Sequence, residues 1–160
     1  MPEIQVLDPA SGGRMMYFDK AEQRVLFGDY RREDFELCDG REFHIHPGLQ
    51  MDFREMPFQN DSFSLVVFDP PHLVNAGPNS WLAKKYGVLD KNQWREDLRR
   101  GFAECFRVLK PTGILIFKWN ETQIKLSEIL ALTPNKPLFG NRQPRQSGTH
   151  WIVWTKEEAQ

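Results

Sequence analysis

The stretch SLVVFDPPH, residues 64–72, joins a short apolar run to an abrupt polar end. Ser64 to Phe68 contains valine, leucine and phenylalanine without regular alternation, which is typical of a strand buried on both faces of a parallel sheet. The Asp-Pro-Pro sequence at residues 69–71 ends such a strand, because proline has no backbone N–H and restricts the residue before it. These residues serve either as a way out of the sheet or as the carboxylate and carbonyl of a reaction centre.

Further apolar runs of similar length occur along the chain, and most are followed by an aspartate. The runs and the residues after them are Ile4–Leu7 before Asp8, Val25–Phe27 before Gly28 and Asp29, Leu49–Met51 before Asp52, Leu65–Phe68 before Asp69, and Ile114–Phe117 before Lys118. Parallel strands end at one edge of a sheet, and open α/β sheets bind ligands at that edge. We therefore predict an α/β fold in which these carboxylates gather around one ligand.

The segments between the runs predict two helices and one hairpin. Residues 90–109 carry apolar residues at three- and four-residue spacing behind a capping-box-like Asp90, which favours a long amphipathic helix. Residues 121–131 predict a shorter helix. Asp39-Gly40, flanked by alternating residues within 35–45, indicates a β-hairpin. Two later stretches, residues 136–139 and 150–154, are candidate strands.

The bulk composition restricts the class of protein. With 160 residues, 40% of them apolar, the chain is expected to form a single domain, 1–160. The 21 basic and 22 acidic residues nearly cancel, so any polyanionic partner must be met by a local basic patch. Two cysteines are too few for a disulfide framework, and the chain shows no signal peptide or membrane-length apolar run. We therefore expect a cytoplasmic protein that makes no use of a membrane.

His44 and His46 are the side chains that most suggest a metal site. They are two residues apart on a predicted strand and would share one of its faces. We expect no metal, because no third ligand lies at a suitable local spacing.

Several stretches, taken in order, carry a family resemblance. They are LDPASGGR at 7–14, FGD at 27–29, MDFREMPF at 51–58, NDSFSLVV at 60–67 and RVLKPTGIL at 107–115. The chain resembles the class I S-adenosylmethionine-dependent methyltransferases over nearly its whole length. The resemblance implies a Rossmann-like, mostly parallel sheet of about seven strands, with an antiparallel final strand and helices on both faces. The hairpin would replace the helix that follows the second strand.

The resemblance also implies a binding site for S-adenosylmethionine. Asp8 would order its loop or contact the methionine amino group, and Gly12 would line the methionine moiety. Asp29 would accept from the ribose hydroxyls, while Asp52 and the Phe53 N–H would bind the adenine. The full set of cofactor-binding candidates is Asp8, Pro9, Ala10, Gly12, Asp29, Asp52, Phe53 and Asp69. Arg14 stands where the family often has a small residue, which leaves the path of this loop open.

Asp-Pro-Pro-His at 69–72 resembles the DPPY-type motif of enzymes that methylate exocyclic amines of nucleobases. An aromatic amine is a poor nucleophile, so Asp69 and the Pro70 carbonyl would accept its two hydrogens and aim the nitrogen lone pair at the methyl group. The catalytic candidates are Asp69, Pro70, Pro71 and His72. His72 stands in the position of the family's aromatic residue and would stack on the base. A surface-loop histidine is the alternative.

The long connection at residues 73–89 is a candidate substrate-contacting flap, since long loops in compact domains are commonly functional. A mobile linker is the alternative, and core packing is the alternative for Trp119. The substrate-binding candidates are His72, Trp81, Lys84, Lys85, Tyr86, Trp119 and Asn120. The two lysines would form a basic patch for phosphates together with Arg95, Arg99, Arg100, Arg142 and Arg145. Surface solvation explains each of these basic residues equally well.

The resemblance therefore implies methyl transfer from S-adenosylmethionine to an exocyclic amino nitrogen of a nucleobase, with adenine in DNA as the first expectation. DNA is expected as a partner ahead of RNA, and specificity would come from short loops, a homodimer or a specificity-giving partner. A small enzyme without a target-recognition domain would suit a phage or mobile element. The alternatives are methylation of RNA, a protein amide or a small molecule, and a non-catalytic cofactor-binding regulatory module.

Overall fold

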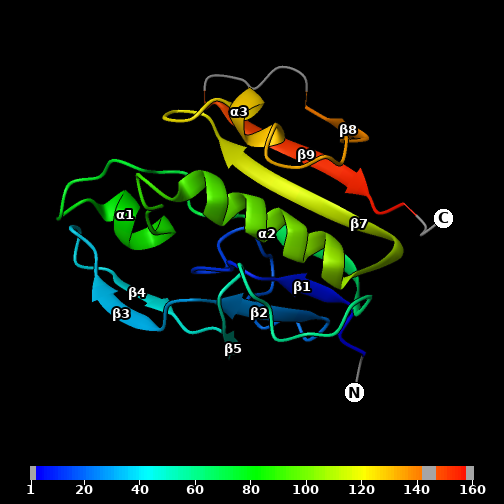
Figure 1. Ribbon diagram of the computed structural model, residues 1–160. Coiled ribbons are helices and arrows are strands. Elements are labelled where there is room, and N and C mark those ends of the chain that lie inside the picture. Colours follow the sequence, from blue (N-terminus) through cyan, green and yellow to red (C-terminus); the bar gives the residue numbers. More distant parts are fainter. Residues whose placement is uncertain (1–2, 142–146, 158–160) are drawn as a thin grey trace.

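A computed structural model describes residues 3–141 and 147–157. Within these residues, seven strands form one sheet in the order β5-β2-β1-β6-β7-β9-β8 (Figure 1). The strands are β1 Val6–Asp8, β2 Val25–Asp29, β5 Leu49–Gln50, β6 Phe63–Phe68, β7 Leu109–Asn120, β8 Phe139–Gly140 and β9 Thr149–Thr155. Only β9 runs antiparallel to its neighbours β7 and β8. The predicted Rossmann-like sheet with an antiparallel final strand is confirmed.

The strand order reverses beside β1. The chain passes from β1 outward through β2 to β5, and then returns to place β6 on the other side of β1. Such a reversal separates the connections on either side of the sheet and opens a crevice at the carboxyl ends of the two strands. Asp8 ends β1 and Asp69 follows β6, so both lie at this crevice.

The main helix is α2, Trp94–Val108, and it forms the core with one face of the sheet. Its inward residues Leu98, Phe102 and Cys105 are fully buried against sheet residues such as Phe68 and Phe117. The Asp90 carboxylate accepts from the backbone N–H of Gln93 at 3.0 Å, but this bond lies in a turn before the helix: α2 begins at Trp94, and its N-cap residue Gln93 makes no side-chain cap. The apolar residues that the periodicity of residues 90–109 predicted to face the core are therefore buried there.

The two other helices are short. They are α1, Trp81–Tyr86, and α3, Leu126–Leu130. The predicted helix over 121–131 is thus shorter than expected, and α1 forms within the stretch we expected to be an irregular flap. No helix in the described part of the chain is long and apolar enough to cross a bilayer.

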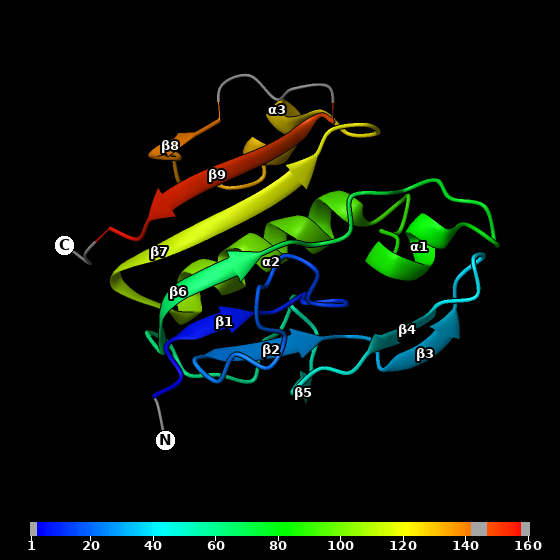
Figure 2. The same cartoon turned by 180° about the vertical axis from the view of Figure 1, so that it is seen from behind.

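The helices α2 and α3 pack on the same face of the sheet, whereas we expected helices on both faces (Figures 1 and 2). The reason lies in the two connections that would supply the other layer. Residues 9–24, between β1 and β2, form a series of turns. The segment after β2 forms the hairpin β3, Glu33–Glu36, and β4, Glu42–Ile45, as the sequence predicted.

The opposite face of the sheet is apolar and only partly covered. Its register row Leu65, Ile114 and Thr155 and the neighbouring row Val67, Ile116 and Val153 run across β6, β7 and β9. Ile114 is 40% exposed, and toward the β8 edge Phe139 is 62% exposed. In the described residues, the turns after β1 cover the β1–β2 part of this face, and no helix covers the rest.

Gly101 of α2 packs closely on two aromatic rings. A Cβ at this position would lie 2.7 Å from the Phe53 ring and 2.9 Å from Phe68. We predict that Gly101→Ala lowers the free energy of unfolding by about 1–3 kcal/mol through overpacking, measured by urea denaturation. Helix propensity alone has the opposite sign, because alanine in place of glycine favours a helix by about 1 kcal/mol. Ala103→Gly, at an exposed position of α2, is the control, because it measures the difference in helix propensity between alanine and glycine without a change in packing. A Gly101→Ala protein that is more stable than the natural protein contradicts the close packing.

Candidate active site

The predicted gathering of carboxylates is present at the carboxyl edge of the sheet. Asp8, Asp29 and Asp69 end or follow the adjacent strands β1, β2 and β6. Asp8 is completely buried, and the two other carboxylates lie close enough to raise its pKa further. Asp52 follows β5 and lines the same cavity as Asp29. The four aspartates therefore belong to one region of the molecule.

Asp29 joins three segments of this region. It is 5% exposed, and its carboxylate accepts from the backbone N–H groups of Gly12, at 2.8 Å, and Arg31, at 2.9 Å. Gly12 has a φ of +51°, which favours glycine. The Arg31 guanidinium donates in turn to the backbone carbonyls of Lys84, at 2.8 Å, and Lys85, at 3.3 Å. The loop after β1 and helix α1 are thereby held to the end of β2.

Asp8 holds the loop after β1 from inside the protein. One of its oxygens accepts from the Ala10 N–H at 3.2 Å and the other from the Tyr17 hydroxyl at 2.8 Å. Burial raises the pKa of Asp8 to about 7, with the Tyr17 hydrogen bond opposing this shift. Of the two roles that the resemblance implied, these contacts correspond to ordering the loop. Asp8 is not among the residues that line the neighbouring cavities.

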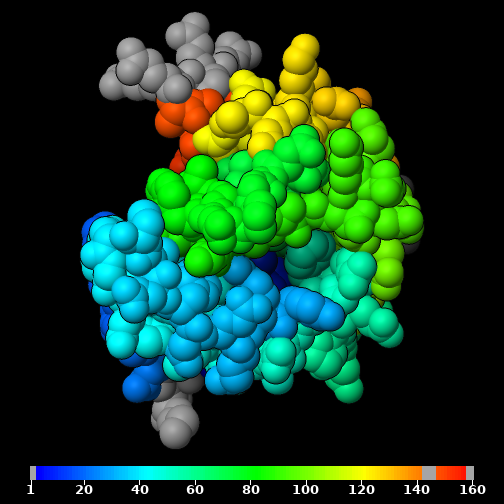
Figure 3. All heavy atoms as spheres, turned by 90° about the vertical axis from the view of Figure 1, so that its left-hand side faces the viewer, coloured from blue at the N-terminus to red at the C-terminus, as the bar shows by residue number. Residues whose placement is uncertain are grey.

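A cleft separates two parts of the chain. On one side lie α1 and the segment after it, and on the other side lie the ends of β2 and β5; Figure 3 shows the cleft as a hollow below the green residues. It is lined by Pro9, Ala10, Asp29, Tyr30, Arg31, Asp52, Phe53, Arg54, Pro71, Tyr86, Gly87, Val88, Leu89, Asp90 and Asp97. The lining combines apolar surface with the buried Asp29, the half-buried Asp52 and Asp97, and the exposed Asp90. We call this the first cavity.

Asp52 is half-buried in the first cavity and already has a partner. Its carboxylate accepts from the Arg54 guanidinium at 2.7 Å, and Arg54 also reaches Asp97 at 3.1 Å. The hydrogen bonds from Arg54 lower the pKa of Asp52, so this carboxylate is charged at neutral pH. A ligand amino group would therefore share Asp52 with Arg54.

The second cavity shares Ala10 and Tyr86 with the first and continues along the loop after β1 to Asp69. It is lined by Ala10, Ser11, Gly12, Gly13, Met15, Met16, Asp69, Pro70, Lys85, Tyr86 and Lys118. The Ser11 hydroxyl is buried here and has no hydrogen-bond partner among the described residues. A buried polar atom without a partner is costly, and a polar ligand group in this cavity would satisfy it.

The third cavity lies on the other side of Asp69. It is lined by Asp69, His72, Leu73, Leu82, Tyr86, Lys118, Asn120, Thr122 and Thr149. The His72 ring is 5.7 Å from the Tyr86 ring and 6.3 Å from the Trp119 ring, measured between centroids. Burial and the nearby Lys118 lower the pKa of His72, which keeps its imidazole neutral at pH 7. The second and third cavities thus share Asp69, Tyr86 and Lys118.

Lys118 is a site residue that the sequence reasoning did not identify. It follows Phe117, the register partner of Phe68, so it stands beside Asp69 on the neighbouring strand. Its ammonium lies 3.5 Å from the Asp69 carboxylate. Burial raises the pKa of Asp69, and the charge of Lys118 opposes that shift. The strand-end position of Lys118 beside four strand-end aspartates was the available signal.

The substrate-binding candidates divide into two groups. His72, Lys85, Tyr86 and Asn120 line the second or third cavity. Trp119 is 1% exposed, donates from its indole N–H to the Ile124 carbonyl and stacks on Phe117, so the alternative of core packing is the correct one. Trp81 and Lys84 lie on α1 and line none of these three cavities.

The candidate basic patch is weakened by pairing. Arg95 forms an ion pair with Glu128, and Arg99 forms one with Glu96. Lys84 and Lys85 lie in the last turn of α1, beside the second and third cavities. Arg100 lies on α2, and the last two members, Arg142 and Arg145, lie outside the described residues.

Comparisons with known proteins bear on the fold. No protein-family model and no curated protein matches the sequence. Among solved structures, a TehB-like SAM-dependent methyltransferase from Corynebacterium glutamicum has a TM-score of 0.59 over 98% of this chain and 83% of its own, at 15% identity. The PH0226 protein from Pyrococcus horikoshii OT3 has a TM-score of 0.59 over 96% of this chain and 82% of its own, at 14% identity. A SAM-dependent methyltransferase from Methanosarcina mazei has a TM-score of 0.57 over 96% and 92%, at 11% identity. The chain thus shares the Rossmann-like fold of these proteins.

The burial of Asp8 predicts how the free energy of unfolding changes with pH. Because its folded pKa is about 7 and its ordinary value is 3.8, the folded state favours protonated Asp8, and this stability is lost as pH rises from about 4 through 7. The difference in unfolding free energy between the natural protein and Asp8→Asn should therefore fall by about 2 kcal/mol from pH 5 to pH 8. Urea denaturation at both pH values measures it, with exposed Asp39→Asn as control. A difference independent of pH contradicts the buried, desolvated position of Asp8.

The contact between Arg31 and α1 makes a second prediction. Arg31→Lys keeps the charge but removes the forked donor that bonds two carbonyls, so α1 should open more often. Trypsin should then cleave after Lys84 or Lys85 about fivefold faster, as expected for a loss of ~1 kcal/mol. Mass spectrometry of the fragments measures the rate. Arg32→Lys is the matched control, since Arg32 donates to the Pro47 carbonyl instead; equal cleavage in both variants rules the contact out as a tether for α1.

Proposed function

We propose that this chain is an S-adenosylmethionine-dependent methyltransferase that acts on an exocyclic amino nitrogen of a nucleobase. The observation that carries the proposal is the sharing of Asp69 and Tyr86 between the second and third cavities. One cavity continues into the first cavity along the glycine-containing loop, and the other ends at His72. Asp69 is therefore available to a donor on one side and to an acceptor on the other.

The first and second cavities suit the two ends of S-adenosylmethionine. Asp29 and Asp52 would hold the ribose hydroxyls and the adenine amino group in the first cavity, because carboxylates accept strongly from such donors. In the second cavity, the partnerless Ser11 hydroxyl and the backbone beside Gly12 would meet the methionine amino and carboxylate groups. When bound, S-adenosylmethionine supplies a methyl group on a positively charged sulfur, which leaves as a neutral thioether with the electron pair of the broken C–S bond.

Asp69 and the Pro70 carbonyl carry the chemistry at the acceptor. They accept the two hydrogens of the amine, which directs the nitrogen lone pair away from both and toward the methyl group. The nitrogen forms the new N–C bond and then releases one hydrogen as a proton. Asp69 accepts this proton readily, because burial raises its pKa above the ordinary value. Lys118 holds the carboxylate charged before the amine arrives.

The third cavity suits a flat aromatic acceptor. His72 and Tyr86 present rings at its wall, and a neutral imidazole stacks on a base without repelling a cationic methyl donor. Lys84 and Lys85 on α1 would contact the flanking phosphates, which is the reason for preferring a nucleic acid to a free small molecule. Adenine in DNA is the proposed acceptor within this class.

Asp69→Asn tests the proposal. The amide keeps the size of the side chain and one acceptor oxygen, but it loses the negative charge and can no longer take the proton that the amine releases, so methyl transfer should fall at least about a hundredfold. Binding of S-adenosylmethionine, measured by calorimetry, should persist. Transfer is measured with isotopically labelled S-adenosylmethionine on DNA, RNA and nucleosides, followed by mass spectrometry of the methylated product.

The control for this experiment is Asp61→Asn, an exposed aspartate paired with Lys156 on another part of the surface. It should retain full transfer. Cofactor binding with transfer to none of the acceptors would contradict the enzyme proposal and favour a regulatory module. Transfer that survives in Asp69→Asn would overturn the assigned role of Asp69.

A further inference from the structure

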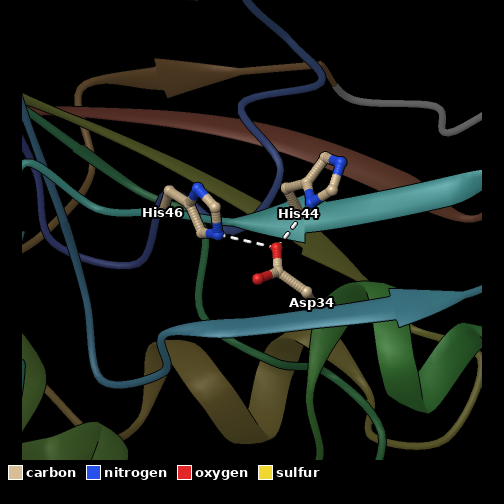
Figure 4. Close-up of side chains that lie close together, drawn as sticks. All are labelled: Asp34, His44 and His46. Atoms are coloured by element: carbon tan, nitrogen blue, oxygen red, sulfur yellow. Dashed lines mark hydrogen bonds and ion pairs between the residues drawn. The ribbon is translucent and has the colours of Figure 1, made fainter.

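A cluster of ligand-type side chains lies outside the candidate active site, on the β3–β4 hairpin. Asp34 of β3 is the register partner of His44 of β4, and His46 follows two residues later (Figure 4). The third group that the local spacing of the two histidines did not offer thus comes from the opposite strand. The ligand-type atoms of Asp34, His44 and His46 all lie within 4.8 Å of one another.

The ligand atoms of the cluster lie close to the spacing that a metal ion requires. His44 Nδ1 lies 2.5 Å, and His46 Nε2 lies 2.7 Å, from the same oxygen of Asp34. A tetrahedral zinc ion, bound at about 2.0–2.1 Å, holds its donor atoms about 3.3 Å apart. Side-chain rotations that move each ligand atom by under about 1 Å would therefore convert this exposed cluster into a three-ligand site.

The second nitrogen of His44 also has the environment of a metal ligand. Its Nε2 lies 3.5 Å from the Glu42 carboxylate, while Nδ1 faces Asp34. Metal-bound histidines commonly donate their other ring N–H to a carboxylate, which fixes the tautomer and the ring orientation. The hairpin therefore supplies both the ligands and one such supporting group.

We propose that Asp34, His44 and His46 bind one zinc ion, with water completing the coordination. Two imidazoles and one carboxylate favour a zinc-type transition ion over magnesium or calcium, which prefer oxygen ligands alone. The ion bridges β3 and β4 and so acts as a clamp on the hairpin. The site is separate from the candidate active site, and its test requires no methyl transfer.

A clamped hairpin would restrict the loop that lines the second cavity, because the two are in contact. The Phe43 side chain points to the other side of β4 from His44 and stacks on Phe35, and a Cβ added to Gly13 would overlap the Phe43 ring. The His46 carbonyl accepts from the Arg14 guanidinium at 2.8 Å. The hairpin is thereby packed on, and bonded to, the loop at residues 8–14.

The test uses tag-free protein in a Cys38→Ser background, because the exposed Cys38 thiol lies on the same hairpin and would itself bind zinc. Zinc affinity and stoichiometry are measured by competition with a chromophoric chelator, and Co²⁺ absorption reports the coordination. We expect one zinc ion per chain. Asp34→Asn, His44→Gln and His46→Gln should each weaken binding at least about tenfold.

Asp39→Asn is the matched control, since it removes the same charge from the same hairpin but pairs with Arg41 outside the cluster. It should bind zinc as tightly as the parent protein. Zinc should also slow trypsin cleavage after Arg41 in the parent and not in the three ligand variants. No stoichiometric binding, or binding that all three variants retain, overturns the site; zinc binding without protection of the hairpin overturns the clamp.

Discussion

The carboxylate of Asp29 is the constraint on which the candidate site depends. It is nearly buried at the end of β2, and it accepts from Gly12 on one side and from Arg31 on the other. Gly12 belongs to the loop that lines the second cavity, and Arg31 bonds the backbone of α1. One side chain thus links the loop that lines the second cavity to helix α1. The sheet supplies the edge, and this carboxylate connects the two segments that lie beside the cleft.

The strand-end aspartates and the long helix could be predicted because their signals are local. The apolar run before Asp69 is itself the strand β6, and a strong apolar stripe marks the helix that begins at Trp94. The coverage of the sheet could not be predicted in this way. Leu65 and Val66 are both aliphatic, yet Val66 is fully buried beneath α2, while Leu65 faces the side of the sheet that no helix of the described residues covers. Whether the second face is covered depends on distant connections.

Two residues that the sequence reasoning missed, one in the candidate site and one on the β3–β4 hairpin outside it, share one cause, which is pairing between segments. Lys118 comes beside Asp69 only through the β6–β7 register, and Asp34 comes beside His44 only through the β3–β4 register. The hairpin signal at Asp39-Gly40 predicted the hairpin but not its register. A two-residue turn at these positions would place Asp34 opposite Ile45, whereas the observed loop spans residues 38–40 and places Asp34 opposite His44. Trp119 was ambiguous because a strand-end tryptophan suits a pocket wall as well as the core. Its indole bond to Ile124 and its stacking on Phe117 place it in the core.

The partly exposed face of the sheet, which no helix of the described residues covers, also affects the heat capacity change of unfolding. The heat capacity change of unfolding is proportional mainly to the apolar area that folding removes from water. A sheet with a core on one side and Ile114, Trp151 and Phe139 left partly in solvent removes less of that area per residue than a sheet covered on both sides. The stability curve of this protein is therefore flatter with temperature than that of a two-sided α/β domain of equal length, with weaker destabilisation on cooling.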